Sequence, residues 1–291
     1  MRNTFPSQLK TIEDAPEPFR RALREQLSSS DTVELLIYGP PYQSGVSRRP
    51  GALLAITDQR WLAVVADDEG EVAASVFQSE YAETLLLEFT TILLYGCLKI
   101  DFAAEGKARS VRVFFNTVMD QLYQHAAQLL LDKMDGVASP SSAKTRKMPA
   151  LLEPLPMKFQ SAILRATPEG ERLEEVVHCS VVLARKHFGF QRELAPEAAL
   201  SLTDRELMLV ADEASWSWLR RARQAKYGSI VTHCPLSRFA GFRVEHHDGI
   251  ATLMLRTHVA QGGETFQVDF PPEKEREIVT LMEHAVLENR V

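Results

Sequence analysis

Leu53-Leu-Ala-Ile-Thr57-Asp58 and Ala199-Leu-Ser-Leu-Thr203-Asp204 are two copies of one pattern, an apolar strand that ends at Thr-Asp, and their residue numbers differ by 146. Upstream, Phe19-Arg-Arg-Ala-Leu23 and Phe159-Gln-Ser-Ala-Ile163 repeat a helical pattern with residue numbers that differ by 140. Similar segments that recur in the same order predict an internal duplication. The second copy would then hold six extra residues between its first two strands, where a loop tolerates an insertion.

The same two offsets relate two further pairs of segments. Val33–Ile37 matches Leu173–Val177 at the offset of 140, and Tyr81 matches Tyr227 at the offset of 146. About nine fewer residues separate this tyrosine from the final helix in the first copy than in the second. We therefore expect the first copy to lack one hairpin strand or to have a shorter hairpin.

Each copy is expected to end in an amphipathic helix, at 116–132 and at 273–287. The apolar stripe of the first helix would hold Val118, Leu122, Ala126 and Leu129, and that of the second would hold Ile278, Leu281, Met282 and Ala285. Alternation and β-branched residues predict short antiparallel strands before each helix. The candidate strands are 33–38, 52–57, 61–66, 72–77, 84–89, 93–102 and 110–115, then 173–183, 199–203, 207–210, 215–221, 229–234, 238–246, 250–259 and 264–270. The expected turns are 58–59, 67–70, 247–249 and 261–263.

This pattern predicts a mainly β fold with capping helices, of the α+β class. Each domain would be an antiparallel, partly open barrel of two orthogonal sheets closed by a C-terminal helix. The first domain, with an N-terminal helix, would cover residues 1–134, and the second, also with an N-terminal helix, would cover 156–291. Residues 135–155 are rich in Pro, Ser, Gly and Lys and are interpreted as a linker.

Composition narrows the class of protein. The chain has 291 residues, 45% of them hydrophobic and 25% charged, which is typical of a soluble globular protein. Its net charge of −6 argues against a general affinity for nucleic acid. Cys97, Cys179 and Cys234 form no CxxC pair, which favours unpaired thiols in a reducing compartment. Because no signal-peptide core and no apolar run of about 18 residues is present, we expect a cytoplasmic protein.

The Thr-Asp stretches also resemble a known family. Leu202-Thr203-Asp204-Arg205, more loosely Ile56–Arg60, and the strand entry at Pro235–Phe239 are similar to segments of the pleckstrin-homology superfamily, in its bacterial PH-like and GRAM-like forms. The resemblance extends over 173–288 and reaches the first copy through the repeat. It implies a tandem PH-like protein, and PH-like barrels host many unrelated binding roles.

The resemblance also implies where a ligand would bind. Lipid-binding members of the superfamily use basic residues in the loop that joins the first two strands. The matching loops here are 39–50 and 184–196. Their candidate binding residues are Arg48, Arg49, Arg185 and Lys186. Neither loop reproduces the spaced Lys/Arg pattern of phosphoinositide binders cleanly, and this departure argues against phosphoinositide recognition.

The densest run of basic residues stands at 219–227 and contains no acidic residue. Its candidate binding residues are Arg220, Arg221, Arg223 and Lys226, preceded by Trp216 and Trp218 on one face of an expected strand. Cations beside exposed aromatic rings would bind anionic headgroups or an acidic partner, and each cation adds about 1 kcal/mol near an anionic surface. Alternatively, the tryptophans belong to the core or to an interdomain contact, and the arginines are solvated.

Metal and catalytic motifs are weak. His178-Cys179 and His233-Cys234 offer ligand types that suit zinc, but neighbouring residues on a strand point to opposite faces. A buried Cys beside an exposed His explains both pairs. The acidic groups at 67–69 and 171–175 fall in a turn and at a strand start, where solvated charge is usual. No nucleophile elbow, zinc-protease, P-loop or dinucleotide motif occurs, so we predict no catalytic residue, metal site or cofactor.

These observations favour a non-enzymatic binding or scaffolding protein. A protein or peptide partner, bound along an exposed strand edge, is the expected ligand. Peripheral attachment to an anionic membrane surface through the basic, Trp-flanked segment is one alternative. An enzyme of unrecognised type, with a site between the two copies, is the other.

Overall fold

The computed structural model describes residues 5–44, 47–66, 74–136, 148–168, 170–185, 191–212, 228–258 and 264–289. Strands predominate and a few helices accompany them, which confirms the predicted mainly β, α+β class. The chain divides into two compact units. Unit 1 is formed by 1–105 and 109–137, and unit 2 by 138–291 with 106–108.

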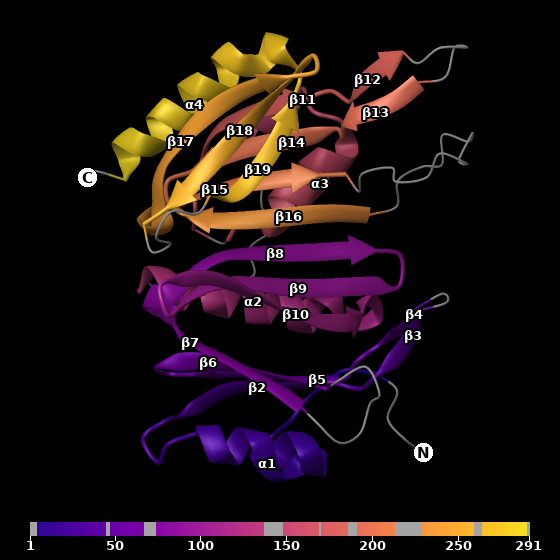
Figure 1. The fold of residues 1–291 in the computed structure, drawn as a ribbon, viewed down its shortest axis with the longest axis vertical. Coiled ribbons are helices and arrows are strands. Elements are labelled where there is room, and N and C mark those ends of the chain that lie inside the picture. Colours follow the sequence, from indigo (N-terminus) through magenta and orange to yellow (C-terminus); the bar gives the residue numbers. More distant parts are fainter. Residues whose placement is uncertain are drawn as a thin grey trace. The chain divides into compact units, whose positions relative to one another are not determined.

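Unit 1 runs from a helix through two sheets to a second helix (Figure 1). Its helical elements, with η denoting a 3₁₀ turn, are η1 (Ile12–Asp14), α1 (Glu17–Gln26), η2 (Tyr81–Glu83), η3 (Thr117–Met119) and α2 (Asp120–Asp135). Its strands are β1 (Ser7–Gln8), β2 (Val33–Gly39), β3 (Tyr42–Ser44), β4 (Ser47–Arg49), β5 (Ala52–Thr57), β6 (Arg60–Ala66), β7 (Ala74–Glu80), β8 (Thr84–Ile92), β9 (Tyr95–Ala104) and β10 (Lys107–Asn116).

The first sheet of unit 1 has the order β1-β2-β5-β6-β7, and β8, β9 and β10 form a second ladder. Every residue of β5 is buried, because its side chains alternate between two apolar layers. Leu53 and Ala55 pack against Phe19 and Leu23 of α1 on the outer face. The inner face packs with the second ladder and α2 into the main core (Figure 1).

Unit 2 has the same plan. Its helical elements are η4 (Ala150–Leu152), α3 (Met157–Ala166), η6 (Leu236–Arg238), η7 (Pro272–Lys274) and α4 (Glu275–Glu288). Its strands are β11 (Leu173–Cys179), β12 (Val182–Arg185), β13 (Gln191–Ala195), β14 (Ala198–Thr203), β15 (Glu206–Ala211), β16 (Gly228–Pro235), β17 (Phe239–His247), β18 (Ile250–Thr257) and β19 (Glu264–Phe270). One ladder has the order β16-β15-β14-β11 and the other β17-β18-β19. Phe159 and Ile163 of α3 cover the first ladder as Phe19 and Leu23 do in unit 1.

The two units repeat one order of elements at three successive offsets in residue number. Helix α3 and strand β11 follow α1 and β2 at an offset of 140, β14 follows β5 at 146, and η6 and α4 follow η2 and α2 at 155. The change from the first offset to the second falls between β11 and β14, as the sequence predicts. The further increase falls between β15 and β16, where unit 1 has only the connection from β6 to β7.

This order corrects the predicted match of Tyr81 with Tyr227. Tyr81 is the first residue of η2, and the first residue of η6 is Leu236. Tyr227 itself lies outside the described residues. The length difference therefore lies between β15 and β16, in a stretch outside the described residues. Strands β8, β9 and β10 each have a counterpart in β17, β18 and β19, so no hairpin strand of unit 1 is missing from the described part of the chain.

The Thr-Asp pattern closes the turn between β5 and β6. Thr57 Oγ1 accepts a hydrogen bond from Arg60 N at 3.0 Å and donates one to Arg60 O at 2.8 Å. Asp58 Oδ1 accepts from Thr32 N at 2.8 Å, which ties this turn to the start of β2. The motif thus satisfies backbone groups that the tight turn leaves without a ladder partner.

Unit 2 makes the same contacts at its own Thr-Asp turn. Thr203 Oγ1 accepts from Glu206 N at 2.9 Å and donates to Glu206 O at 3.3 Å. Asp204 Oδ1 accepts from Arg172 N at 3.0 Å. Since both side chains repeat their hydrogen bonds, the recurring Thr-Asp reflects a recurring backbone geometry.

The sheets do not close into barrels, which corrects that part of the fold prediction. A barrel needs a ladder that joins its first and last strands. Among the described residues, no ladder joins the two sheets of either unit. In unit 1, the edge of the first sheet beside β2 is occupied by β1, whose Ser7 pairs with Tyr38.

Other sequence predictions have mixed outcomes. The turns at 58–59 and 247–249 are confirmed, with Gly249 at a φ of 81°. Val118 lies in η3 and is exposed, so its place on the apolar stripe of the helix is wrong. The turns at 67–70 and 261–263, the strand at 215–221 and part of the predicted linker fall outside the described residues. No helix among the described residues is long and apolar enough to cross a bilayer.

Candidate functional site

The hairpin β3–β4 of unit 1 carries two of the predicted binding residues. Gln43 pairs with Arg48 and Tyr42 pairs with Arg49 across this hairpin. Because neighbours on a strand point to opposite faces, the two arginines face different surroundings. Arg48 is exposed and Arg49 is half-buried.

Arg49 is held against aromatic rings. Its guanidinium carbon lies 4.8 Å from the centroid of the Tyr95 ring and 4.9 Å from that of Phe114, within the range of a cation–π contact. Its Nε atom is buried and has no hydrogen-bond partner. Burial raises the pKa of Tyr95, and also that of Tyr42, to about 12, so both rings stay neutral. Arg49 therefore anchors the hairpin on β9 and β10, and Arg48 is the exposed arginine of this hairpin.

An exposed apolar group projects from the turn that follows β8. Leu93 is 67% exposed, Leu94 62% and Val118 62%, and we name these three residues the turn patch. Thr117 Oγ1 donates to Leu93 O, and Thr117 N donates to Leu94 O at 3.4 Å, so η3 and the turn are joined. Leu93 has a φ of 52°, a conformation that branched residues rarely adopt. The turn patch lies beside Tyr95 and therefore next to the β3–β4 hairpin.

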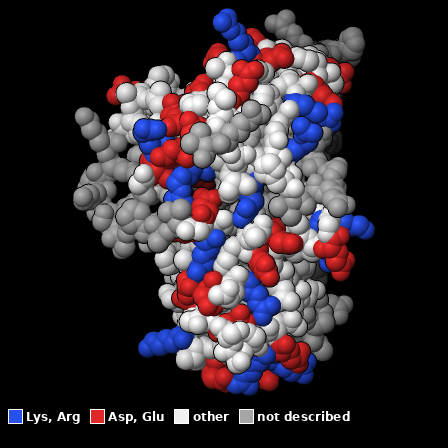
Figure 2. Space-filling view, turned by 90° about the vertical axis from the view of Figure 1, so that its left-hand side faces the viewer, with Lys and Arg blue, Asp and Glu red and all other residues white. Residues whose placement is uncertain are grey.

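The remaining predicted binding residues belong to unit 2. Arg185 lies at the end of β12, where its backbone pairs with Gln191. The others lie outside the described residues: Lys186, Trp216, Trp218, Arg220, Arg221, Arg223 and Lys226. Their role in binding stays a prediction. On the face drawn in Figure 2, basic and acidic side chains are interspersed, and the coloured part shows no broad area of one sign.

The Cys-His pairs lie at buried or half-buried positions of their strands. Cys97, Cys179 and Cys234 are free and buried, and burial raises the pKa of the Cys97 and Cys179 thiols to about 12. His178 forms an ion pair with Glu197 at 3.0 Å. His233 is buried rather than exposed, and its Nδ1 lies 2.9 Å from Glu206 Oε2.

Glu206 belongs to a buried acidic corner at the start of β15. Glu171 lies in the same corner and accepts a hydrogen bond from Thr203 Oγ1 at 2.8 Å. Burial, and then the Glu206 carboxylate, raise the pKa of Glu171 well above its ordinary value. Arg205 lies 3.7 Å from Glu171, and Glu206 Oε1 has no hydrogen-bond partner.

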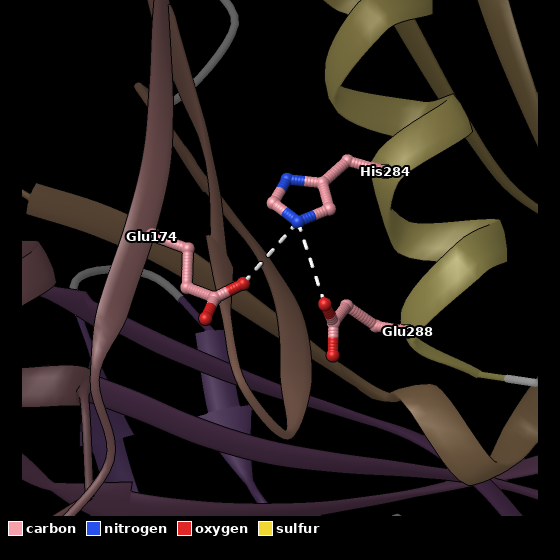
Figure 3. Close-up of side chains that lie close together, drawn as sticks. All are labelled: Glu174, His284 and Glu288. Carbon is pink, nitrogen blue, oxygen red and sulfur yellow. Dashed lines mark ion pairs between the residues drawn. The ribbon is translucent and has the colours of Figure 1, made fainter. Parts of the chain in front are cut away.

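A second group gathers where α4 crosses the start of β11. His284 Nε2 lies 3.5 Å from Glu174 Oε2 and 3.5 Å from Glu288 Oε1. Figure 3 marks both contacts with dashed lines. The three ligand atoms all lie within 4.8 Å of one another, so they could hold a metal ion. We name Glu174, His284 and Glu288 the His284 cluster.

Sequence reasoning named the acidic residues at 171–175 but missed the residues that meet them in the fold, Glu206, His284 and Glu288. The spacing of His284 and Glu288 by four residues on a helix was the available signal, since such residues share one face. The contribution of Glu174 depends on a bulge in β11, which leaves Glu174 without a register partner between Leu173 and Glu175. Solvated charge was therefore the wrong explanation for part of the segment 171–175.

Comparison with known proteins gives no relative: no family model, no curated protein and no solved structure matches this chain.

Proposed function

We propose that this protein is a non-enzymatic binding protein built from two pleckstrin-homology-like domains that arose by duplication. Three features support this proposal. Each unit has four long strands, then a three-stranded ladder and a final helix. The order of elements is the same in both units, and the Thr-Asp hydrogen bonds recur at equivalent positions. The sequence resemblance to PH-like and GRAM-like segments agrees with this plan.

Unit 1 binds a phospholipid surface through its turn patch. The observation that carries this proposal is the exposure of Leu93 and Leu94 on the turn after β8 and of Val118 in η3, which is hydrogen-bonded to that turn. Moving an exposed Leu or Val side chain out of water contributes about 1.5–3 kcal/mol. Arg48 on the neighbouring hairpin supplies a cation for headgroup phosphates. A turn with apolar tips and a nearby cation suits an interface that is apolar inside and anionic outside.

Sedimentation with lipid vesicles tests this function. The full chain is mixed with neutral and with anionic phospholipid vesicles at low and at physiological salt. The test variant is Leu93→Asn with Leu94→Gln, because Asn tolerates positive φ and the fold is kept. The matched control is Leu287→Gln, since Leu287 is 61% exposed on α4, far along the chain from the turn.

We expect the wild type and the Leu287→Gln control to sediment with anionic vesicles and the double variant to stay in solution. Binding that survives physiological salt indicates apolar insertion, since salt screens exposed charges beyond about 8 Å. A further variant, Arg220→Ala, Arg221→Ala and Arg223→Ala, measures the contribution of the basic segment. If the wild type does not sediment with either vesicle, the membrane proposal is wrong and the predicted protein or peptide partner takes its place.

A further inference from the structure

The two units differ in charge at one equivalent position. In unit 1, a bulge between Val33 and Leu35 leaves Glu34 without a register partner, and its carboxylate pairs with Lys133 of α2 at 2.7 Å. In unit 2, the same bulge presents Glu174 to α4. The position that Lys133 holds on α2 is taken on α4 by Glu288. On the final helix, the bulge carboxylate of unit 2 thus meets a glutamate where its counterpart in unit 1 meets a lysine.

We propose that a divalent transition-metal cation, with Zn²⁺ as the representative ion, binds in unit 2 between Glu174, His284 and Glu288. His284 replaces Leu129 of α2 and brings an imidazole to the place where the lysine is missing. Imidazole and carboxylate together form a ligand set that suits zinc and its neighbours in the first transition row.

Two of the three pairs of ligand atoms have the spacing that such an ion needs, and all three atoms lie within 4.8 Å of one another. Zinc lies about 2.0–2.2 Å from nitrogen and oxygen ligands, which puts tetrahedral ligand atoms about 3.4 Å apart. His284 Nε2 lies 3.5 Å from each of its two carboxylate oxygens. Glu174 and Glu288 project toward the imidazole from β11 and α4 (Figure 3). Three protein ligands leave a fourth position for water.

One oxygen of the Glu174 carboxylate is buried and available to a metal ion. Its side chain is only 10% exposed, and its Oε2 atom is buried without a hydrogen-bond partner. Arg172 holds the other oxygen, Oε1, at 2.5 Å. An unsatisfied buried carboxylate oxygen is costly, so a cation bound at Oε2 would remove that penalty.

Groups around the ligands orient them. Glu175 Oε2 lies 3.5 Å from His284 Nδ1, on the side of the ring that faces away from Glu174 and Glu288. A carboxylate on one ring nitrogen favours the tautomer whose other nitrogen binds a metal. Three carboxylates therefore surround one imidazole, and Arg172 is the one permanent cation that the described residues place in ion-pair contact with them. A divalent ion would balance the two remaining negative charges.

Zinc uptake by the full chain tests the site. The apo protein is titrated with Zn²⁺ in competition with a chromogenic chelator, and crystals grown with zinc are measured at the zinc absorption edge. We expect one Zn²⁺ per chain with anomalous density at His284 Nε2. Affinity is expected to fall by more than about 100-fold in His284→Ala and by about 10- to 100-fold in Glu175→Gln, which alters only the orienting carboxylate.

Two further variants separate loss of the metal site from loss of the fold and from zinc binding by any exposed histidine. Glu288→Lys recreates the unit 1 arrangement, so it should fold as the wild type does and yet lose zinc. His246→Gln is the matched control, since His246 is an exposed histidine paired with Glu275 at 3.3 Å, and it should keep zinc. The proposal is overturned if the wild type takes up no stoichiometric zinc, or if its uptake persists unchanged in both His284→Ala and Glu288→Lys.

Discussion

Unit 1 and unit 2 share a backbone plan but differ in where they place cations. At the start of the second hairpin strand, unit 1 has Arg60 and unit 2 has Glu206, and on the final helix Lys133 is exchanged for Glu288. Both exchanges put carboxylates together in unit 2 where unit 1 has an ion pair. The apolar positions and the Thr-Asp turns maintain the fold, so the charges around them are free to diverge toward other roles.

The same comparison holds for packing in the core. Gly39 of unit 1 faces the Tyr123 hydroxyl, and the equivalent pair in unit 2 is Cys179 and Ile278. Unit 1 thus combines the smallest residue with a large ring, and unit 2 combines two residues of middle size. A larger side chain on the helix is thus matched by a smaller one on the strand, as close packing between strand and helix requires.

The largest effect is expected from Arg60→Glu, which gives unit 1 the residue of unit 2. Arg60 pairs with Asp31 at 2.7 Å and also donates to Gln26 O at 2.8 Å. Its loss leaves a carboxylate that is almost fully buried, and we expect a cost of about 3 kcal/mol, because the partner of a buried charge is removed. Hydrogen exchange should rise in unit 1 peptides and stay unchanged in those of unit 2. Equal protection of unit 1 amides from exchange in the variant and the wild type would show that the ion pair between Arg60 and Asp31 does not stabilise this unit.

A smaller effect is expected from Gly39→Cys. A Cβ at this position would lie 2.8 Å from the Tyr123 hydroxyl, and overpacking of this kind costs about 1–3 kcal/mol. Adding Tyr123→Ile, the residue of unit 2, should recover part of the loss. Urea denaturation of the two single variants and the double variant gives the coupling free energy, and strict additivity would show that the two positions do not compensate.

Glu171→Gln should stabilise unit 2 by about 1–2 kcal/mol at pH 8, since it removes a buried carboxyl that prefers its proton. The pKa of Glu171 is raised in the folded state, so its contribution to stability declines as pH rises above the ordinary value of 4.5. Asp31 behaves in the opposite way: hydrogen bonds from Arg60 and Ser28 lower its pKa, and its contribution is lost only as pH falls below the ordinary value of 3.8. Thermal unfolding of the wild type and of Glu171→Gln between pH 5 and pH 8 checks the prediction for Glu171. If the two proteins show the same dependence of stability on pH, the buried acidic corner does not act as described.

The smallest effect is expected from Lys133→Glu, about 0.5 kcal/mol, because the pair that it forms with Glu34 is partly exposed. With Leu129→His added, unit 1 would carry the ligands of the His284 cluster at equivalent positions. Zinc titration of this double variant then shows whether the fold alone positions a second metal ion.

Much of the fold could be predicted from the sequence, for reasons that particular residues make clear. Some residues repeat because they make the same contacts in both units, as Phe19 and Phe159 do in the core and Thr57 and Thr203 do at the tight turn. The difference in residue number between such matched residues changes where the connection between two strands is longer in one unit. The match of Tyr81 with Tyr227 is wrong because it depends on one shared residue, without a run of similar neighbours to fix the alignment. Closure of the sheets was not predictable from alternation, since period-two patterns show which face is buried and not which strands pair.

The candidate sites were harder to predict. The turn patch depends on Val118 leaving the helix for η3, although helical periodicity assigns it to the buried stripe. The His284 cluster requires both a bulge in β11 and the packing of α4 against β11, so residues far apart in the sequence meet only in the folded chain. A charge exchange between two units is visible in sequence only after their strands have been aligned in structure.

The left-handed backbone of Leu93 has a consequence for how this chain would evolve in the laboratory. A branched side chain in that conformation costs about 1–2 kcal/mol, which Gly or Asn would largely avoid. Selection for heat resistance alone should therefore replace Leu93 early, whereas selection that also requires membrane attachment should retain it. The fate of one residue under the two regimes would show whether its apolar side chain is kept for a purpose other than stability.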